Sequence, residues 1–197
     1  MNTGKHVNIC QPGGGASCAL CCGSHNYNVS EDEMRRIFAQ RRALYREHME
    51  TVETRQGSGD EVVDINREEF YRMRPPKRIE DAIQCPYIGY IDDEETLIGC
   101  LLYAGSRQGD IRFSNFQNNT CVIFSCLARE ILTEEEILYA ARLTGDWFYY
   151  SLLINDINLL RKTAKEFPRP EDVPEDLLDK IKAGLREAAF CEVLPQP

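Results

Sequence analysis

The sequence predicts an α-rich α+β fold, in which cysteine-bearing loops and a β-hairpin pack on three or four helices. Apolar residues recur at helical spacing over residues 31–50 and over much of the chain after residue 133. Residues 87–103 instead hold two short stretches rich in β-branched and aromatic residues, separated by an acidic turn. Eight of the nine cysteines precede residue 127 and lie in or beside the segments that connect these elements.

The composition is that of an ordinary soluble globular protein, with 43% hydrophobic and 28% charged residues in a chain of 197. A chain of this length forms one domain, or one domain with an appendage. We expect residues 1–130 to form a cysteine-rich region and residues 131–197 to form a C-terminal helical region of the same domain. The net charge of -9 argues against broad nucleic-acid binding, which depends on contacts of Lys and Arg with phosphates.

The chain contains no apolar run of the roughly 20 residues needed to cross a bilayer. Its first ten residues also lack the apolar core of a signal peptide. We therefore expect a cytoplasmic protein that does not bind membranes. In that reducing compartment, cysteine thiols remain available as ligands.

A capping box predicts where the first helix begins. Ser30 is followed three residues later by Glu33, so each side chain can satisfy a backbone N–H group of the other. The apolar spacing that follows predicts a helix over 31–50. Its basic run from Arg35 to Arg46 is interleaved with carboxylates, and we expect it to be a solvated helix face.

A second capping box, Thr133 with Glu136, predicts a helix that ends at Gly145. The segment from Trp147 to Leu160 carries apolar residues on several faces, which predicts a largely buried helix. A last amphipathic helix is expected to end near Ala189.

The region between these helices contains smaller elements. We expect a short strand at residues 61–65, a brief helix at 67–72, and a hairpin whose strands cover 87–91 and 96–103. Pairing of the hairpin strands would bring Cys85 and Cys100, near their outer ends, close together.

Four cysteines fall within thirteen residues of a glycine-rich stretch, and four more lie in two later segments. A Cys-x2-Cys spacing lets two sulfurs from one tight turn point at one metal ion, and glycines permit such a turn. Eight thiols suit two sites of four sulfurs, the usual ligand set for zinc or for a [4Fe–4S] cluster. The candidate metal ligands are Cys10, Cys18, Cys21, Cys22, Cys85, Cys100, Cys121 and Cys126.

Other roles for these cysteines are less consistent with the sequence. Disulfides would need an oxidising compartment, and the chain is long enough to bury a core without them. Scattered buried cysteines would not cluster at this density. His25 is the best non-cysteine ligand candidate, with a hydrogen bond to its own loop as the alternative, and Cys191 is expected to bind nothing.

The cysteine pattern consists of Cys10-x7-Cys18-x2-Cys21-Cys22, Cys85-Pro-Tyr, Gly99-Cys100-Leu-Leu-Tyr and Cys121-x4-Cys126. It resembles the pattern of the YkgJ-type cysteine-cluster proteins over roughly residues 10–130. The resemblance implies a zinc- or iron-chelating domain, and relatives are often described as iron–sulfur proteins. The chain lacks the Cys-x2-Cys that usually precedes the double cysteine. It also has Phe124-Ser-Cys126-Leu in place of the Arg-Pro-x-x-Cys-Arg segment of many members.

Two features favour iron–sulfur over zinc. Side chains of adjacent residues diverge, so Cys21 and Cys22 would strain the chain if both bound one tetrahedral zinc ion. The wide cysteine spacings are also unlike paired zinc knuckles. We therefore expect one or two iron–sulfur clusters of the [4Fe–4S] type, with zinc as the alternative.

The expected function is that of a metal-binding, iron–sulfur protein with a redox or electron-transfer role, or one whose cluster is structural. It would act with a redox or protein partner that the sequence does not identify. The alternative is a zinc-binding scaffold or interaction module without redox chemistry. The sequence leaves enzymatic activity open: similar cysteine clusters also occur in flagellin lysine methylases, but the chain carries no methyl-donor motif.

Overall fold

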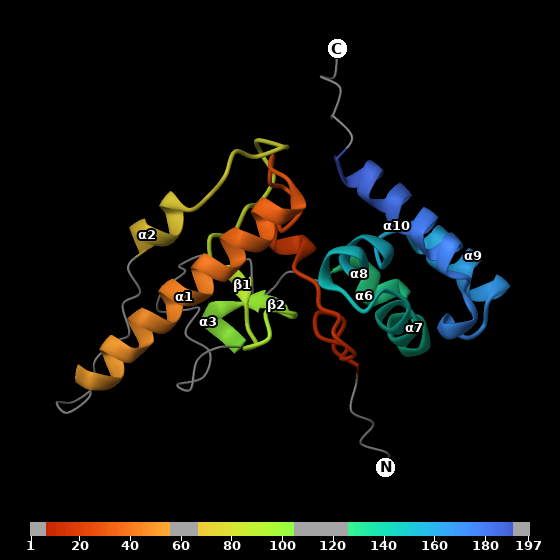
Figure 1. The fold of residues 1–197 in the computed structure, drawn as a ribbon, viewed down its shortest axis with the longest axis horizontal. Coiled ribbons are helices and arrows are strands. Elements are labelled where there is room, and N and C mark those ends of the chain that lie inside the picture. The colour runs from red at the N-terminus through yellow and green to blue at the C-terminus, as the bar shows by residue number, and fades with distance from the viewer. Residues whose placement is uncertain (1–6, 56–66, 105–125, 191–197) are drawn as a thin grey trace. The chain divides into compact units, whose positions relative to one another are not determined.

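A computed structural model describes three stretches of the chain, residues 7–55, 67–104 and 126–190 (Figure 1). These stretches divide into two compact units. The helical unit comprises residues 7–20 and 126–190, and the hairpin unit comprises residues 21–55 and 67–104. The α+β prediction is confirmed in its coarse form, because the described chain is rich in helix and contains a two-stranded antiparallel sheet.

The hairpin unit contains one long helix, several short ones and the sheet. Its elements are η1 (Leu20–Cys22, which begins at the last residue of the helical unit), α1 (Glu31–Arg55), α2 (Arg67–Arg72), β1 (Ile88–Tyr90), β2 (Ile98–Cys100) and α3 (Leu101–Ala104).

Helix α1 starts where the capping residue predicts and runs further than expected. The amide of Glu33 donates to the Ser30 hydroxyl at 3.2 Å, which satisfies one N–H group of the first turn. The apolar side chains of α1 are buried at helical spacing, and they are Met34, Ile37, Phe38, Tyr45 and Met49.

The hairpin is antiparallel, as predicted, with Ile88 opposite Cys100. Its turn is held by Asp92, whose carboxylate accepts the amides of Thr96 and Leu97. The predicted second strand is wrong beyond Cys100, because the chain enters α3 there. Neighbouring Leu101 and Leu102 are both buried in the unit's core, whereas successive residues of a strand point to opposite faces.

The helical unit contains short helices joined by tight connections. They are α6 (Leu127–Ile131), α7 (Glu134–Thr144), α8 (Trp147–Leu153), α9 (Ile157–Glu166), η2 (Pro170–Asp172) and α10 (Glu175–Phe190). The described chain as a whole therefore has more helices than the three or four that we expected.

The second capping box is confirmed in full, with Thr133 and Glu136 each accepting the other's backbone amide. Helix α7 ends at Gly145, also as predicted. The prediction of one helix from Trp147 to Leu160 is wrong, because the chain forms α8 and then α9. The Asp156 carboxylate accepts the amide of Leu159 at 3.0 Å and so starts a new helix.

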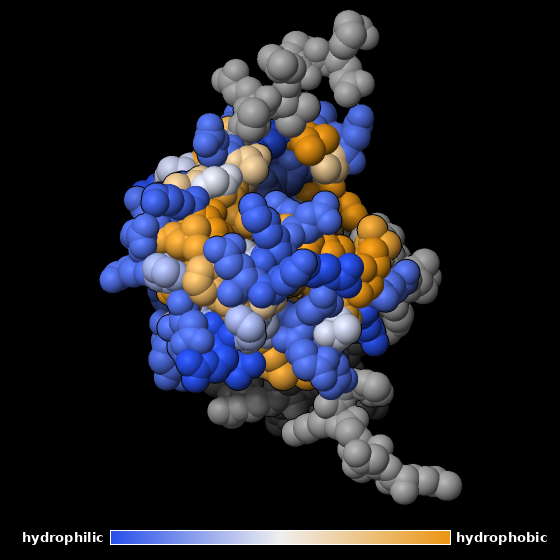
Figure 2. Space-filling model, turned by 90° about the vertical axis from the view of Figure 1, so that its right-hand side faces the viewer, coloured by the Kyte–Doolittle hydropathy of each residue, from blue (hydrophilic) through white to orange (hydrophobic). Residues whose placement is uncertain are grey.

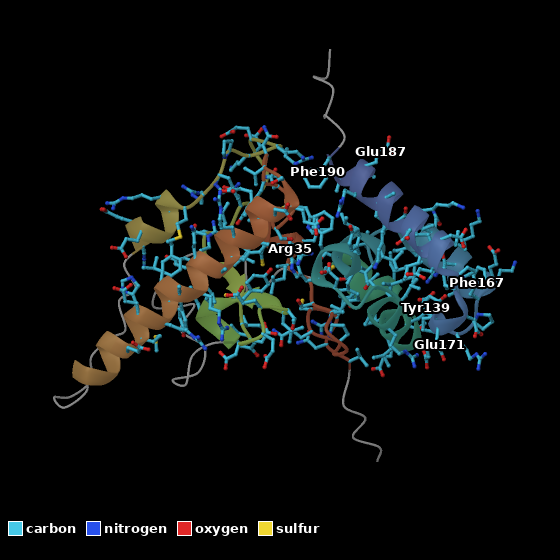
Figure 3. All side chains as sticks on the ribbon, in the orientation of Figure 1. Arg35, Tyr139, Phe167, Glu171, Glu187 and Phe190 are labelled. Atoms are coloured by element: carbon cyan, nitrogen blue, oxygen red, sulfur yellow. The ribbon has the colours of Figure 1, made fainter. Side chains whose placement is uncertain are left out.

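The core of the helical unit is built largely from α7, α8 and α9, and Trp147 is 0% exposed, as predicted. Figure 2 shows that hydrophilic residues cover much of the face on the side of α9, with hydrophobic residues visible between them. Figure 3 shows Tyr139 and Phe167 close together, where the Tyr139 hydroxyl donates to the Phe167 carbonyl at 2.8 Å. This bond ties α7 to the end of α9.

Three predictions lie outside the described residues: the strand at 61–65, the ligand role of Cys121 and the inert role of Cys191. Within the described stretches, no helix has the length and apolar character that a membrane span requires.

Candidate metal centre

Four of the candidate ligands belong to the hairpin unit and come from three of its segments. Cys21 and Cys22 end η1, Cys85 precedes β1, and Cys100 ends β2. The amide of Cys85 donates to the carbonyl of Cys22 at 2.9 Å, so the first two segments are joined at the cysteines themselves.

This close approach depends on Gly23. Its φ is +85°, in the left-handed region that favours glycine, and a Cβ there would lie 1.9 Å from the Ile83 carbonyl oxygen. The glycine after the double cysteine therefore lets the loop lie against the backbone just before Cys85.

Neighbouring groups and burial shift the pKa of Cys22. Its pKa is raised well above the usual range, first by the hydrogen bond with Cys21 and then by burial. The charges of Cys21, Cys85 and Cys100 raise it further. These charges disfavour a second thiolate at Cys22.

Cys21 and Cys22 behave as a pair. The hydrogen bond from Cys22 lowers the pKa of Cys21 to about 7, although partial burial opposes the shift. The lowered pKa makes Cys21 the member of the pair that forms a thiolate more readily.

Three further candidates lie in the helical unit. The amide of Cys18 donates to the Cys10 carbonyl at 2.9 Å, across a loop in which Gly13, Gly14 and Gly15 all have positive φ. Cys126 immediately precedes α6 and packs, like Cys18, against the unit's hydrophobic core.

The charges of all three of these cysteines affect the pKa of Tyr150. It is buried, and its hydroxyl donates to the Ile9 carbonyl at 2.8 Å. Burial raises its pKa far above the usual range, and the charges of Cys18, Cys10 and Cys126 raise it further. The Tyr150 phenol therefore stays neutral near pH 7.

The sequence analysis missed Arg41 beside the first group. Arg41 belongs to the basic run that we expected to be solvated, but it is 0% exposed. It donates to the Tyr27 hydroxyl at 2.5 Å, and its guanidinium carbon lies 5.5 Å from the centre of the Tyr27 ring. Helical spacing contained the signal: residue 41 follows Phe38 by three positions and precedes Tyr45 by four, on the apolar face of α1.

The histidines of the described chain make hydrogen bonds. His25 Nδ1 lies 2.9 Å from the hydroxyl of Ser24, which is the loop contact given above as the alternative to metal ligation. His48 Nε2 lies 3.1 Å from the Glu69 carboxylate.

The described cysteines thus divide between the units: Cys21, Cys22, Cys85 and Cys100 belong to the hairpin unit, and Cys10, Cys18 and Cys126 belong to the helical unit. Among the described residues, no three His, Cys, Asp or Glu side chains lie close enough together to hold one metal ion. The donor chemistry suits zinc or iron–sulfur, since both take four cysteine sulfurs.

No protein-family model, curated protein or solved structure matches the chain. The resemblance to the YkgJ-type cysteine-cluster proteins therefore stays a prediction.

Proposed function

We propose that this chain is a cysteine-ligated metal-binding protein, with an iron–sulfur cluster in a redox, electron-transfer or structural role. The observation that carries the proposal is that the hairpin unit joins the three segments bearing its four described cysteines. The Cys85 amide donates to the Cys22 carbonyl at 2.9 Å, and Cys100 pairs with Ile88 across the sheet. Thiolate is the form of cysteine that binds metal, and Cys21 already favours it near neutral pH.

The iron–sulfur assignment rests on where these thiols come from. They belong to a 3-10 turn, a loop and a strand end, rather than to the two matched knuckles common in zinc sites. Four cysteines are the usual ligands of a [4Fe–4S] cluster, which supplies one-electron transfer. Cys10, Cys18 and Cys126 would supply ligands to a second site, with Cys121 as the expected fourth.

A zinc-binding scaffold is the second candidate, and the donor set favours it. Cys21, Cys22, Cys85 and Cys100 belong to one unit, and four cysteine sulfurs are a usual ligand set of structural zinc. Such a centre would hold the hairpin unit together without redox chemistry.

The test is metal analysis of protein purified without oxygen. Iron and acid-labile sulfide in stoichiometric amounts, with a brown colour, are expected for the iron–sulfur protein. Stoichiometric zinc without sulfide would support the zinc scaffold instead. Protein that contains neither iron nor zinc would refute metal binding. Cys22→Ala should lose the hairpin-unit metal, whereas Cys191→Ser, the matched control, should retain all of it.

A further inference from the structure

Residues 10–18 form a hairpin-like loop in the helical unit, with a cysteine at each end of its base. The Cys18 amide donates to the Cys10 carbonyl at 2.9 Å, and Gly13 pairs with Ala16 where the loop turns back. In an antiparallel pair, residues that face each other across a backbone hydrogen bond have Cα atoms about 5.5 Å apart. Disulfides usually join Cα atoms about 4.4–6.8 Å apart, so the backbone holds these two cysteines at a separation that a disulfide can span.

Helix α8 fixes both sides of this base. The Tyr150 hydroxyl donates to the Ile9 carbonyl at 2.8 Å, and the Ser151 hydroxyl donates to the Ser17 carbonyl at 3.4 Å. Ile9 and Ser17 are the residues immediately before the two cysteines, and Tyr150 and Ser151 are adjacent on α8. All four residues are buried. The core of the helical unit therefore holds the two ends of the loop opposite each other.

The two thiols of the loop differ in their access to solvent. Cys10 is exposed, whereas Cys18 is partly buried and packs against the hydrophobic core. The Leu20 amide donates to the Cys18 sulfur at 3.5 Å, which restrains the Cys18 side chain. In thiol–disulfide exchange, an exposed cysteine can react with a small disulfide in solution, and a second cysteine beside it then displaces the bound molecule. Cys10 suits the first of these roles and Cys18 the second.

We propose that Cys10 and Cys18 are a reversible redox pair, oxidised to a disulfide by a low-molecular-weight disulfide such as oxidised glutathione. The Cys10 thiol gives up its proton and attacks one sulfur of the oxidant, which forms a mixed disulfide and releases one glutathione. The Cys18 thiol then gives up its proton and attacks the Cys10 sulfur, which releases the second glutathione. The protein loses two electrons and two protons, and the oxidant takes them up to become two glutathione thiols.

This redox pair goes beyond the proposed function, because the exchange takes place in the metal-free protein. Transient disulfides that sense redox state also form in reducing compartments, so the pair does not need the oxidising compartment of a structural disulfide. Oxidation would withdraw Cys10 and Cys18 from the second proposed metal site. It would leave the four described cysteines of the hairpin unit unchanged.

The test exposes the reduced, metal-free, full-length chain to oxidised glutathione, then blocks the remaining thiols and maps the disulfides by peptide mass spectrometry. We expect the first disulfide to join Cys10 to Cys18. Cys18→Ser should trap Cys10 as a glutathione adduct, because the second step is lost. Cys126→Ser is the matched control, since Cys126 also packs against the core of this unit, and it should leave the disulfide intact. A first disulfide between other cysteines, or none at all, would overturn the proposal.

Tyr150→Phe tests whether α8 positions the pair, because it removes the hydrogen bond to Ile9 and keeps the ring. Tyr139→Phe is the matched control, since it removes the 2.8 Å bond to the Phe167 carbonyl in the same unit. We expect Tyr150→Phe to slow disulfide formation about 10-fold and Tyr139→Phe to leave the rate unchanged, with urea unfolding as the measure of any general loss of stability. Equal rates in the two variants would contradict positioning by α8. Metal analysis of protein purified without oxygen decides the proposed function separately, so either inference can fail without the other.

Discussion

The backbone amide of Cys85 donates a 2.9 Å hydrogen bond to the carbonyl of Cys22, sixty-three positions earlier in the chain. This bond joins the double cysteine to the segment that leads into the hairpin. Gly23 makes the approach possible, since its positive φ turns the chain and its missing Cβ leaves room for the Ile83 carbonyl.

Gly23→Ala should therefore destabilise the hairpin unit. The left-handed backbone alone costs about 1–2 kcal/mol for a residue with a Cβ, and the contact at 1.9 Å adds to it. Hydrogen exchange of the amides of residues 21–104 and urea unfolding measure the effect. The control is Gly14→Ala, because Gly14 also has a positive φ but no described atom lies within 4 Å of its added Cβ. Equal effects of the two changes would contradict the steric argument.

The alkylation rate of Cys21 should depend on pH with a midpoint near pH 7. Below this pH the Cys21 thiol is protonated and slow, and above it the thiolate reacts rapidly. The measurement is alkylation of reduced, metal-free protein with iodoacetamide, followed by peptide mass spectrometry. Cys22→Ala removes the hydrogen bond that lowers the pKa of Cys21, so the midpoint should move towards the ordinary value of about 8.5. An unchanged midpoint would show that Cys22 is not the cause.

Trp147→Ala should cost about 3–5 kcal/mol of unfolding free energy, because the indole is fully buried and packs against Phe148 at 5.6 Å between ring centres. Urea unfolding followed by circular dichroism measures the change. Leu138→Ala on α7 is the control, since Leu138 is exposed and its loss should cost roughly 0.5 kcal/mol or less. A neutral Trp147→Ala with altered binding of another protein would instead point to surface recognition.

The interactions of the Glu136 carboxylate at the start of α7 should stabilise the protein near neutral pH, and acid should remove this stabilisation. The hydrogen bond from Arg161 lowers the pKa of Glu136. Burial opposes this shift, and the Thr133 amide and the charge of Arg161 lower the pKa further. Because the folded-state pKa is depressed, this contribution is complete above the unfolded-state pKa of about 4.3 and is lost as pH falls through the folded-state value.

Thr133→Ala should cost about 1 kcal/mol at pH 7, the usual value for a helix cap. Glu136→Gln should also destabilise the protein at pH 7, and its deficit should shrink as the pH falls below about 4. Thermal unfolding across this pH range tests both. A deficit of Glu136→Gln that stayed constant with pH would rule out the ionised carboxylate as its source.

Removal of the proposed metal should loosen the hairpin unit before the helices α7 to α10. The proposed metal would hold together thiolates from distant segments, whereas these helices have their own apolar core. Limited proteolysis after treatment with a chelator should cut first within residues 21–104, and oxygen should bleach an iron–sulfur form. First cleavage within residues 134–190 would contradict this order.

The sequence by itself determined the elements whose signals are local. Ser30 and Thr133 mark the starts of α1 and α7 because a cap satisfies amides only two or three residues away. The burial of Trp147 and the pairing of the hairpin also follow from short apolar patterns. Where a local rule competed with packing, the prediction was wrong: Leu101 and Leu102 form a helix in the core, and Asp156 starts a helix inside an apolar run.

Only the tertiary structure decided how the cysteines are grouped. Cys18 and Cys21 are three residues apart, yet Cys18 lies with the C-terminal helices while Cys21 lies with the hairpin. Packing likewise decided the burial of Arg41, which the sequence indicated only through its helical spacing from Phe38 and Tyr45. Both outcomes depend on which distant segments pack around a residue. The partners of a buried charge and the ligands of a metal site are set by three-dimensional packing, because electrostatic energy and metal coordination depend on distance in space.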